Sequence, residues 1–321
     1  MEDTNCPYEI HFAPLQGYTD AVFRNAYDSF FGGITAYYTP FIRVEGRNMF
    51  RNRDLRDIEP ENNTVPRLIP QILPGSPEEF RLLAELLLSK GYATADINMG
   101  CPFPMIAGKK KGSGMLPYPE LVQETLNTLN EYPQMEFSLK MRLGWENPGE
   151  CMVLADIINN LRLSHITLHA RLGKQQYKGV PDVEAFRYFY EVCKHPLFYN
   201  GDLKTGEECK QILVKFPLLR GVSVGRGLVS SPLLAKEFTK NETFSEKERM
   251  SLFSGFHATL FSAYSERLQG ENQLLTKMKT LWEYFLPETD RKALKKIKKS
   301  NKLSEYTAVV NGIFGQSFSI L

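Results

Sequence analysis

The chain has 321 residues, 42% of them hydrophobic and 24% charged, with a formal net charge of +2, a composition typical of a folded globular protein and not of a disordered or fibrous one. No apolar run approaches the roughly 20 residues that a membrane helix requires, and the acidic N-terminal segment MEDTNCPYEI lacks the basic and apolar regions of a signal peptide. We therefore expect a cytoplasmic protein with no membrane segment.

Short apolar runs alternate with longer amphipathic ones up to about residue 240. The strand candidates, in chain order, are residues 9–15, 34–39, 67–72, 95–99, 137–142, 165–170, 196–201 and 221–225. A helix-sized connection follows most of them, and strands that alternate with helices indicate a parallel sheet. Eight such units predict an α/β fold over residues 1–240, a closed (β/α)8 TIM barrel.

The connection at residues 76–91 shows clear helix signals. Ser76 is a candidate N-cap, Pro77 stands at the first helical position, and Glu79 would complete a capping box. Gly91 is typical of a residue that ends a helix. We expect such helices to cover the outside of the barrel.

After residue 240 the pattern changes to helical stretches without a convincing strand, which predicts a small all-helical C-terminal domain over residues 241–321. This segment has 12 Lys and Arg against 9 Asp and Glu, and seven of its basic residues fall in RKALKKIKKSNK, residues 291–302.

The five cysteines are scattered and form no C-x-x-C pair, so neither a zinc site nor a disulfide framework is expected, and we predict no metal. Polar residues follow most of the predicted strands, where barrel enzymes place their working groups. They are Gln71, Asn98, Cys101, Lys140, Arg142, His169, Arg171, Asn200, Asp202 and Arg226.

Glycine-bearing turns follow the last two predicted strands, NGD at residues 200–202 and VGRG at residues 224–227. Barrels commonly bind a phosphate there through backbone N–H groups, and Arg226 adds a cation. We expect a cofactor with one terminal phosphate, its ring toward Lys140, Gln71 and the first strand. The fingerprint G-x-G-x-x-G is absent, which disfavours a tightly bound dinucleotide.

The chain resembles the tRNA-dihydrouridine synthases, flavin enzymes that reduce selected uridines in transfer RNA. The motifs that carry the resemblance are FAPLQGYTD (12–20), INMGCP (97–102), GSGML (112–116), LKMRLGW (139–145), LHARLGKQQYKG (168–179), YNGDL (199–203) and VSVGRG (222–227). They cover the whole predicted barrel in order, and the helical tail matches the family's RNA-binding domain in size and position.

The resemblance implies FMN as cofactor and NADPH or NADH as the transient reductant. It implies a flavin held by Pro14, Leu15, Gln16, Gln71, Lys140, His169, Asn200, Gly201, Asp202, Gly225 and Arg226. It also implies that Cys101 is the proton donor and that Asn98, Arg142 and Tyr177 address the target base, and we assign Arg171 to the substrate with them. Reduction of uracil takes a hydride at C6 and a proton at C5, and a thiol is mostly protonated near neutral pH.

A uridine must leave its stack to reach a flavin at the barrel mouth. We expect Lys109, Lys110 and Lys111 to bind phosphates beside the everted base and residues 291–302 to bind the tRNA body. The protein would act as a monomer. Two alternatives remain: an FMN barrel enzyme that acts on a free pyrimidine or a dihydroorotate-like molecule, and an RNA-binding protein without activity.

Overall fold

The computed structural model describes residues 6–46 and 49–315. In this part of the chain, parallel strands form one sheet in the order β3-β2-β1-β9-β8-β7-β6-β5-β4. Their bounds are β1 Glu9–Phe12, β2 Ala36–Tyr38, β3 Leu68–Ile69, β4 Gln71–Ile72, β5 Thr94–Met99, β6 Glu136–Gly144, β7 Leu163–Leu172, β8 Leu197–Asn200 and β9 Gly221–Val224. Each of the eight predicted strands is present, and the TIM-barrel prediction is confirmed.

The predicted strand at residues 67–72 is divided by Pro70 into β3 and β4. Proline has no N–H for a sheet ladder, but its carbonyl still accepts a hydrogen bond, here from the backbone N–H of Asp96 at 2.9 Å. β3 pairs with β2 and β4 pairs with β5, so the two halves together occupy the place of one strand and close the barrel.

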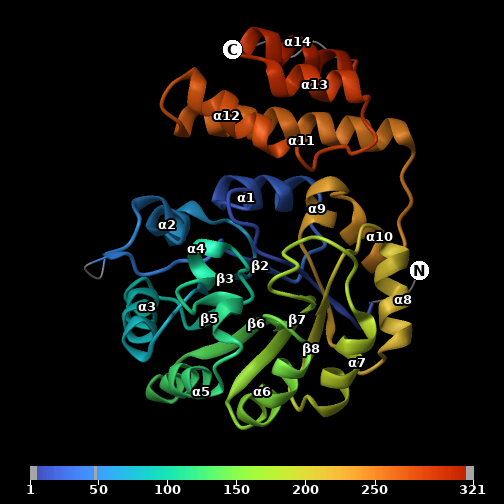
Figure 1. Ribbon diagram of the computed structural model, residues 1–321. Coiled ribbons are helices and arrows are strands. Elements are labelled where there is room, and N and C mark those ends of the chain that lie inside the picture. Colours follow the sequence, from blue (N-terminus) through green and yellow to red (C-terminus); the bar gives the residue numbers. More distant parts are fainter. Residues whose placement is uncertain (1–5, 47–48, 316–321) are drawn as a thin grey trace.

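Helices surround this sheet (Figure 1). They are α1 Ala21–Phe30, α2 Asn52–Asp57, α3 Pro77–Ser89, α4 Pro104–Ala107, α5 Pro119–Asn127, α6 Gly149–Asn159, α7 Val183–Val192, α8 Gly206–Lys215, α9 Arg226–Ser230 and α10 Leu234–Lys240, with a 3-10 turn, η3, at Gly112–Met115. The Ser76 side chain caps α3 as predicted. The prediction of a capping box is wrong for its second hydrogen bond. The Glu79 carboxylate accepts from the backbone N–H of Gly75 and not from that of Ser76.

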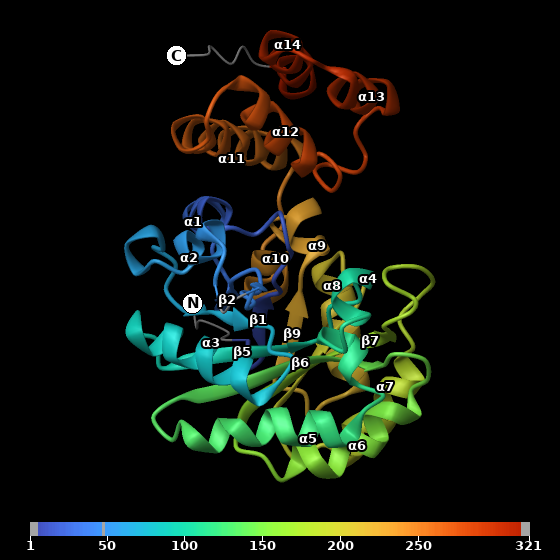
Figure 2. The ribbon, with the colours of Figure 1, turned by 60° about the vertical axis from the view of Figure 1, so that its left-hand side comes forward.

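Four further helices follow: α11 Glu246–Arg267, α12 Glu271–Leu281, α13 Arg291–Lys299 and α14 Leu303–Phe314. Figures 1 and 2 show them on one end of the barrel, with α11 and α12 next to the barrel and α13 and α14 farther from it. We call this group of helices the helical cap. None of the helices in the described residues combines the length and apolar character that a membrane crossing requires.

The helical cap packs on α1 through aromatic side chains. The ring of Phe256 on α11 lies 5.4 Å from that of Phe23, in an edge-on arrangement. Gly255 allows close approach, since a Cβ at this position would lie 2.9 Å from the ring of Phe30. The apolar core is therefore continuous between the barrel and the cap. A division at residues 240 and 241 remains a proposal, and it falls between α10 and α11.

Candidate functional site

A cavity of about 380 Å³ lies at the carboxyl ends of the barrel strands. Nine of the predicted cofactor residues line it: Pro14, Leu15, Lys140, His169, Asn200, Gly201, Asp202, Gly225 and Arg226. Two do not. Gln16 lines a neighbouring crevice, and Gln71 is buried with its amide bonded to Asp96 and Asn98. We call this space the mouth cavity.

The helical cap completes the wall of the mouth cavity with Glu283, Tyr284, Pro287 and Glu288. The Tyr18 hydroxyl donates a 2.5 Å hydrogen bond to Glu283, and the rings of Tyr18 and Tyr284 lie 5.0 Å apart. The sequence contains no signal for these wall residues, because they follow no strand and reach the cavity only through tertiary packing.

Lys140 and Asn200 form one side of the mouth cavity. The Lys140 ammonium donates to Asn200 Oδ1 at 3.1 Å, and Asn200 Nδ2 donates to the carbonyl of Ser223 at 2.6 Å, which fixes the amide orientation. Burial lowers the pKa of Lys140 from its ordinary value. Burial also lowers the pKa of His169 well below its usual range, so the imidazole is neutral at pH 7. Lys140 can therefore offer an ammonium group to a ligand, and His169 can offer a neutral imidazole ring.

Asp202 holds two arginines together at the rim. Arg171 binds its carboxylate through two nitrogens, at 2.8 and 2.5 Å, and Arg226 binds it at 2.6 Å. Hydrogen bonding from Arg171 lowers the pKa of Asp202. The Arg171 side chain is fully buried and forms an ion pair with Asp202, so it fixes the position of the Asp202 carboxylate at the rim. The guanidinium of Arg226 lies 4.5 Å from the centre of the Tyr177 ring.

Cys101 follows β5 in a turn that its neighbours define. Asn98 Oδ1 accepts from the backbone N–H groups of Gly100 and Cys101 at 3.0 and 2.9 Å. The Cys101 carbonyl accepts from the backbone and hydroxyl of Ser113 at 3.0 and 2.9 Å. Gly112 has φ +57°, and a Cβ there would lie 2.7 Å from the Cys101 carbonyl, so only glycine fits. Burial raises the pKa of the half-buried Cys101 thiol, which keeps it protonated at neutral pH.

Arg142 joins the Cys101 turn to the loop after β7. Its Nε donates to the carbonyl of Gly100 at 2.9 Å, and its Nη1 donates to the carbonyls of Leu172 and Gln176, both at 2.7 Å. Burial lowers its pKa to about 10, so the guanidinium remains charged at neutral pH. Its centre lies 5.5 Å from the Tyr177 ring. The predicted base-contacting residues Arg142 and Tyr177 are thus neighbours.

The three lysines of the predicted phosphate-binding loop differ in environment. Lys109 is exposed, and the Lys110 ammonium lies 4.1 Å above the Tyr118 ring. Lys111 is mostly buried and forms an ion pair with Glu79, with contacts of 2.5 and 2.6 Å. Since the same carboxylate accepts from Gly75, Lys111 ties this loop to the loop after β4.

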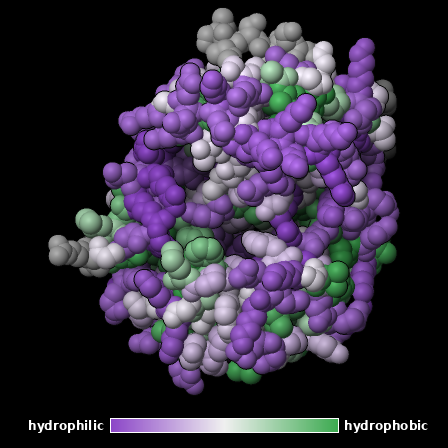
Figure 3. Space-filling view, turned by 45° about the horizontal axis from the view of Figure 1, so that its top comes forward, coloured by the Kyte–Doolittle hydropathy of each residue, from purple (hydrophilic) through white to green (hydrophobic). Residues whose placement is uncertain are grey.

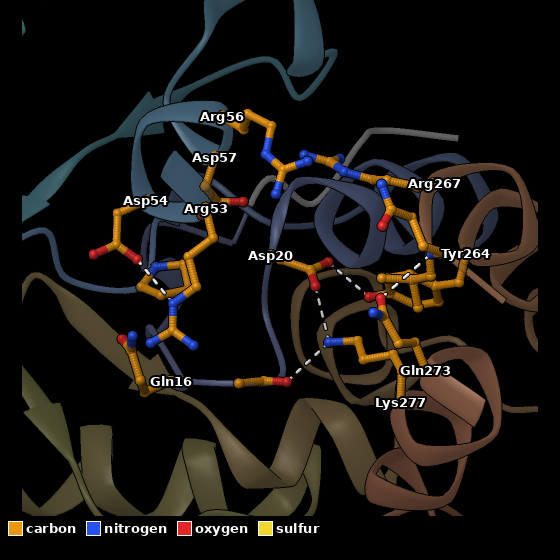
Figure 4. A pocket seen from close by; sticks show the side chains of 14 residues that line it. Gln16, Asp20, Arg53, Asp54, Arg56, Asp57, Tyr264, Arg267, Gln273 and Lys277 are labelled. Atoms are coloured by element: carbon orange, nitrogen blue, oxygen red, sulfur yellow. Dashed lines mark hydrogen bonds and ion pairs between the residues drawn. The ribbon is translucent and has the colours of Figure 1, made fainter. Parts of the chain in front are cut away.

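A second crevice, of about 570 Å³, lies between the barrel and the helical cap, and Figure 4 views it closely. Lys277 forms hydrogen bonds with the carbonyl of Gly17 and with Asp20, and Tyr264 donates to Asp20. Arg56 and Arg267 extend toward each other from opposite walls (Figure 4), and neither guanidinium has a hydrogen bond or ion pair within the described residues. We call this space the basic crevice.

The face turned forward in Figure 3 is largely hydrophilic and is hollowed between the helical cap and the barrel. The described part of the chain has no cluster of three or more His, Cys, Asp or Glu side chains that could hold a metal ion. All five cysteines are free. Cys101, Asn98 and Arg142 are not among the residues that line the mouth cavity, whose polar side chains include Lys140, His169, Asn200, Asp202 and Arg226.

Comparisons with known proteins find similar sequences over most of the chain. The family model described as Dihydrouridine synthase (Dus) matches residues 11–311. A "tRNA-dihydrouridine synthase B" of Pasteurella multocida is 26% identical over 76% of this chain and 71% of its own length. A "tRNA-dihydrouridine(16) synthase" of Pseudomonas syringae pv. tomato is 29% identical over 71% of this chain and 74% of its own length.

Among solved structures, morphinone reductase in complex with tetrahydroNAD has a TM-score of 0.53 and 10% identity, over 76% of this chain and 90% of that one. At this identity the likeness shows the barrel fold alone.

Proposed function

This chain belongs to the dihydrouridine synthase family, and on that premise we propose that it reduces the C5–C6 double bond of specific uridines in tRNA, with FMN as cofactor and NADPH or NADH as reductant. The observation that carries the proposal is the convergence of nine predicted cofactor residues on one cavity at the strand ends. The Cys101 thiol, whose pKa burial raises, lies on the turn after β5 at the same end of the barrel.

The mouth cavity fits a flavin mononucleotide in its donors. Arg226 and Lys204 supply positive charge for a phosphate, beside the glycines of the turns after β8 and β9. Gly225 keeps this rim open, because a Cβ there would lie 3.2 Å from the Leu15 side chain. Lys140 would bind the polar edge of the ring, where negative charge accumulates in the reduced form. His169 and Asn200 would hold the ring on the same side.

When bound, FMN would supply the hydride for C6 of uracil, with NADPH or NADH as the source of its electrons. Cys101 donates the proton to C5 as a general acid, and its raised pKa keeps the thiol in the required state. The thiolate left behind regains its proton from solvent before the next turnover. A depressed pKa, which suits a nucleophilic cysteine, would be harmful here.

Asn98, Arg142 and Tyr177 would receive the everted base. The Nε and Nη1 groups of Arg142 are already bonded to carbonyls, which leaves Nη2 for a uracil oxygen on which charge builds. Tyr177 is half exposed beside the cavity and can stack on the base. Arg171 would act on the substrate indirectly, by holding Asp202 and through it Arg226.

The tRNA itself would contact the hydrophilic face between the barrel and the cap. Arg56 and Arg267 in the basic crevice have no anionic partner in the described residues, and α13 exposes Lys292, Lys295, Lys296, Lys298 and Lys299. Lys109 and Lys110 would bind phosphates beside the base. Residues 241–321 would then form a tRNA-binding domain of a monomeric, cytoplasmic enzyme.

Two measurements test the function. Nucleoside mapping of tRNA from cells that lack the protein should show loss of dihydrouridine at defined positions. Purified enzyme should oxidise its reduced flavin with unmodified tRNA and not with free uridine. Equal turnover of free uridine would favour a small-molecule pyrimidine enzyme, and protein that stays colourless after addition of FMN would favour an RNA-binding protein without activity.

A further inference from the structure

A buried carboxylate lies at the start of a chain of hydrogen bonds that ends at Cys101. Asp96, on β5, is fully buried in the barrel. Its Oδ1 accepts from the Ser138 hydroxyl at 2.6 Å, and its Oδ2 accepts from Gln71 Nε2, also at 2.6 Å. Gln71 Oε1 in turn accepts from Asn98 Nδ2 at 2.7 Å. Asn98 Oδ1 accepts from the backbone N–H of Cys101 at 2.9 Å.

Only one orientation of the Gln71 and Asn98 amides satisfies the groups at both ends of this series of hydrogen bonds. Burial raises the pKa of Asp96 to about 6, so its carboxylate is ionised at pH 7 and above. An ionised carboxylate can only accept hydrogen bonds, and Gln71 therefore turns its NH₂ group toward Asp96. The Gln71 oxygen then faces Asn98, and the NH₂ group of Asn98 donates a hydrogen bond to it. Its oxygen is thereby directed at the backbone N–H groups of Gly100 and Cys101, which can only donate. A flip of the Gln71 amide would place oxygen against oxygen at Asp96 and donor against donor at Asn98. A flip of the Asn98 amide would place oxygen against oxygen at Gln71 and donor against donor at the two backbone N–H groups.

We propose that Asp96 is a positioning residue for Cys101, which it holds in place by setting the direction of the Gln71 and Asn98 amides. The inference builds on the proposed function, in which Cys101 is the proton donor. It adds a residue that never touches cofactor or substrate. General acid catalysis needs the thiol within hydrogen-bond reach of C5, and a shift of about 1 Å can cost about 100-fold in rate.

The charge of Asp96 has a second effect that must be separated from its direction-setting role. Lys140 is also buried, and Asp96 favours its charged form. Asp96→Asn and Asp96→Ala both remove this charge. Only Asn keeps the direction, because its carbonyl can accept from Gln71 while its NH₂ group donates to the Ser138 oxygen. Asp96→Ala leaves Gln71 with no acceptor at that end.

The first test is a double-mutant cycle between position 96 and Cys101, read as the single-turnover rate at which unmodified tRNA oxidises prereduced, flavin-saturated enzyme. Asp96→Ala should lower the rate about 10- to 100-fold when Cys101 is present. In the Cys101→Ala background it should lower the residual rate less than about twofold, since the group being positioned is gone. Asp96→Asn should recover most of the rate. An equal loss in both backgrounds, or Asn as poor as Ala, would overturn the inference.

The second test needs no turnover and therefore decides the inference even if the proposed function fails. Flavin-free protein is treated with iodoacetamide, and the alkylation rates of the Cys101 and Cys6 peptides are followed by mass spectrometry. Asp96→Ala should change the Cys101 rate severalfold and leave the Cys6 rate unchanged, and Asp96→Asn should change neither. An unchanged Cys101 rate in Asp96→Ala would contradict the inference.

A control separates these effects from general loss of stability. Asp28→Ala removes a carboxylate that accepts from the Tyr37 hydroxyl at 2.8 Å, in the layer between α1 and β2. It should lower the melting temperature without altering the Cys101 alkylation rate. If Asp96→Ala does not fold, Gln71→Met interrupts the same chain at its middle link, and the cycle and the alkylation are run with that variant.

Discussion

Lys277 of the helical cap forms an ion pair of 2.8 Å with Asp20, and Asp20 is also the N-cap of α1 in the barrel. The same carboxylate accepts from the Tyr264 hydroxyl at 2.6 Å. One side chain thus starts a barrel helix and binds two helices of the cap. The position of the cap over the mouth cavity depends on this group as well as on aromatic packing.

Asp20→Ala is expected to destabilise the protein more than loss of a cap alone. Asp182 is the matched control, because its side chain caps α7 through the N–H of Ala185. Asp182→Ala should cost about 1 kcal/mol. Asp20→Ala should cost about 3 kcal/mol, since it also removes the anionic partner of the largely buried Lys277, which keeps only the Gly17 carbonyl, and the acceptor of the buried Tyr264 hydroxyl. Chemical denaturation measures both, and equal losses would show that the contacts with the cap contribute nothing.

Cys101→Ala should retain bound flavin and its reduction by NADPH while product formation falls by about 10²–10⁴-fold, the usual contribution of a general acid. Flavin absorbance and dihydrouridine content of the tRNA are the two measurements. Cys193→Ala serves as control, because this partly buried thiol ends α7 and contacts the carbonyl of His195. Full product formation by Cys101→Ala would remove this thiol from the mechanism.

The rate of uridine reduction should be level through neutral pH and fall only in alkaline solution. Burial raises the pKa of Cys101, so the acid form persists above the ordinary thiol value of about 8.5, and activity is lost as pH rises through the raised value. Single-turnover oxidation of reduced enzyme by tRNA, followed from pH 6 to 10, gives this profile. Burial lowers the pKa of Lys140 to about 8, so loss of its proton should also lower the rate in alkaline solution. The part of the alkaline fall that belongs to Cys101 is the part that is missing from the residual rate of Cys101→Ala, and a fall already complete at pH 7 would contradict a protonated donor.

The three loop lysines should separate into two classes. Lys109→Ala and Lys110→Ala should each weaken tRNA binding and reduce the slope of log K against log salt by about one. Lys111→Ala should lower stability with little change in that slope, because its charge is paired with Glu79. Lys194, exposed before β8 at the opposite end of the barrel, is the neutral control. A similar slope change for all three would mean that the Glu79 pair opens when tRNA binds.

Much of this molecule is predictable from local patterns. Strand-length apolar runs and helix caps locate the barrel elements, and the rule that barrel enzymes work at the carboxyl ends of strands brings Lys140, His169 and Asn200 to one cavity. The rule says which end of a strand carries a side chain but not which partner satisfies it. The sequence therefore does not show that Arg171 forms an ion pair with Asp202, or that Lys111 forms one with Glu79.

Contacts between distant segments were beyond reach. Tyr284 lies more than 250 residues from Tyr18, and nothing in either local sequence indicates that their rings meet beside the cavity. The sequence predicts Gln71 as a cofactor ligand, and it contains no signal that the Gln71 amide is bonded to Asp96 and Asn98. The division of one predicted strand at Pro70 has a local cause, because proline has no N–H to donate to the hydrogen-bond ladder of a sheet.

Tyr284 and Pro287 line the mouth cavity together with residues at the strand ends. The helical cap therefore cannot be exchanged for that of a relative without a change in the cavity. A chimera that joins this barrel to a relative's tail would alter the volume and polarity of the cavity proposed for the flavin, together with the contacts proposed for tRNA. Attempts to redirect the enzyme to another nucleotide by swapping tails should therefore carry Tyr18 and its neighbours across as a unit.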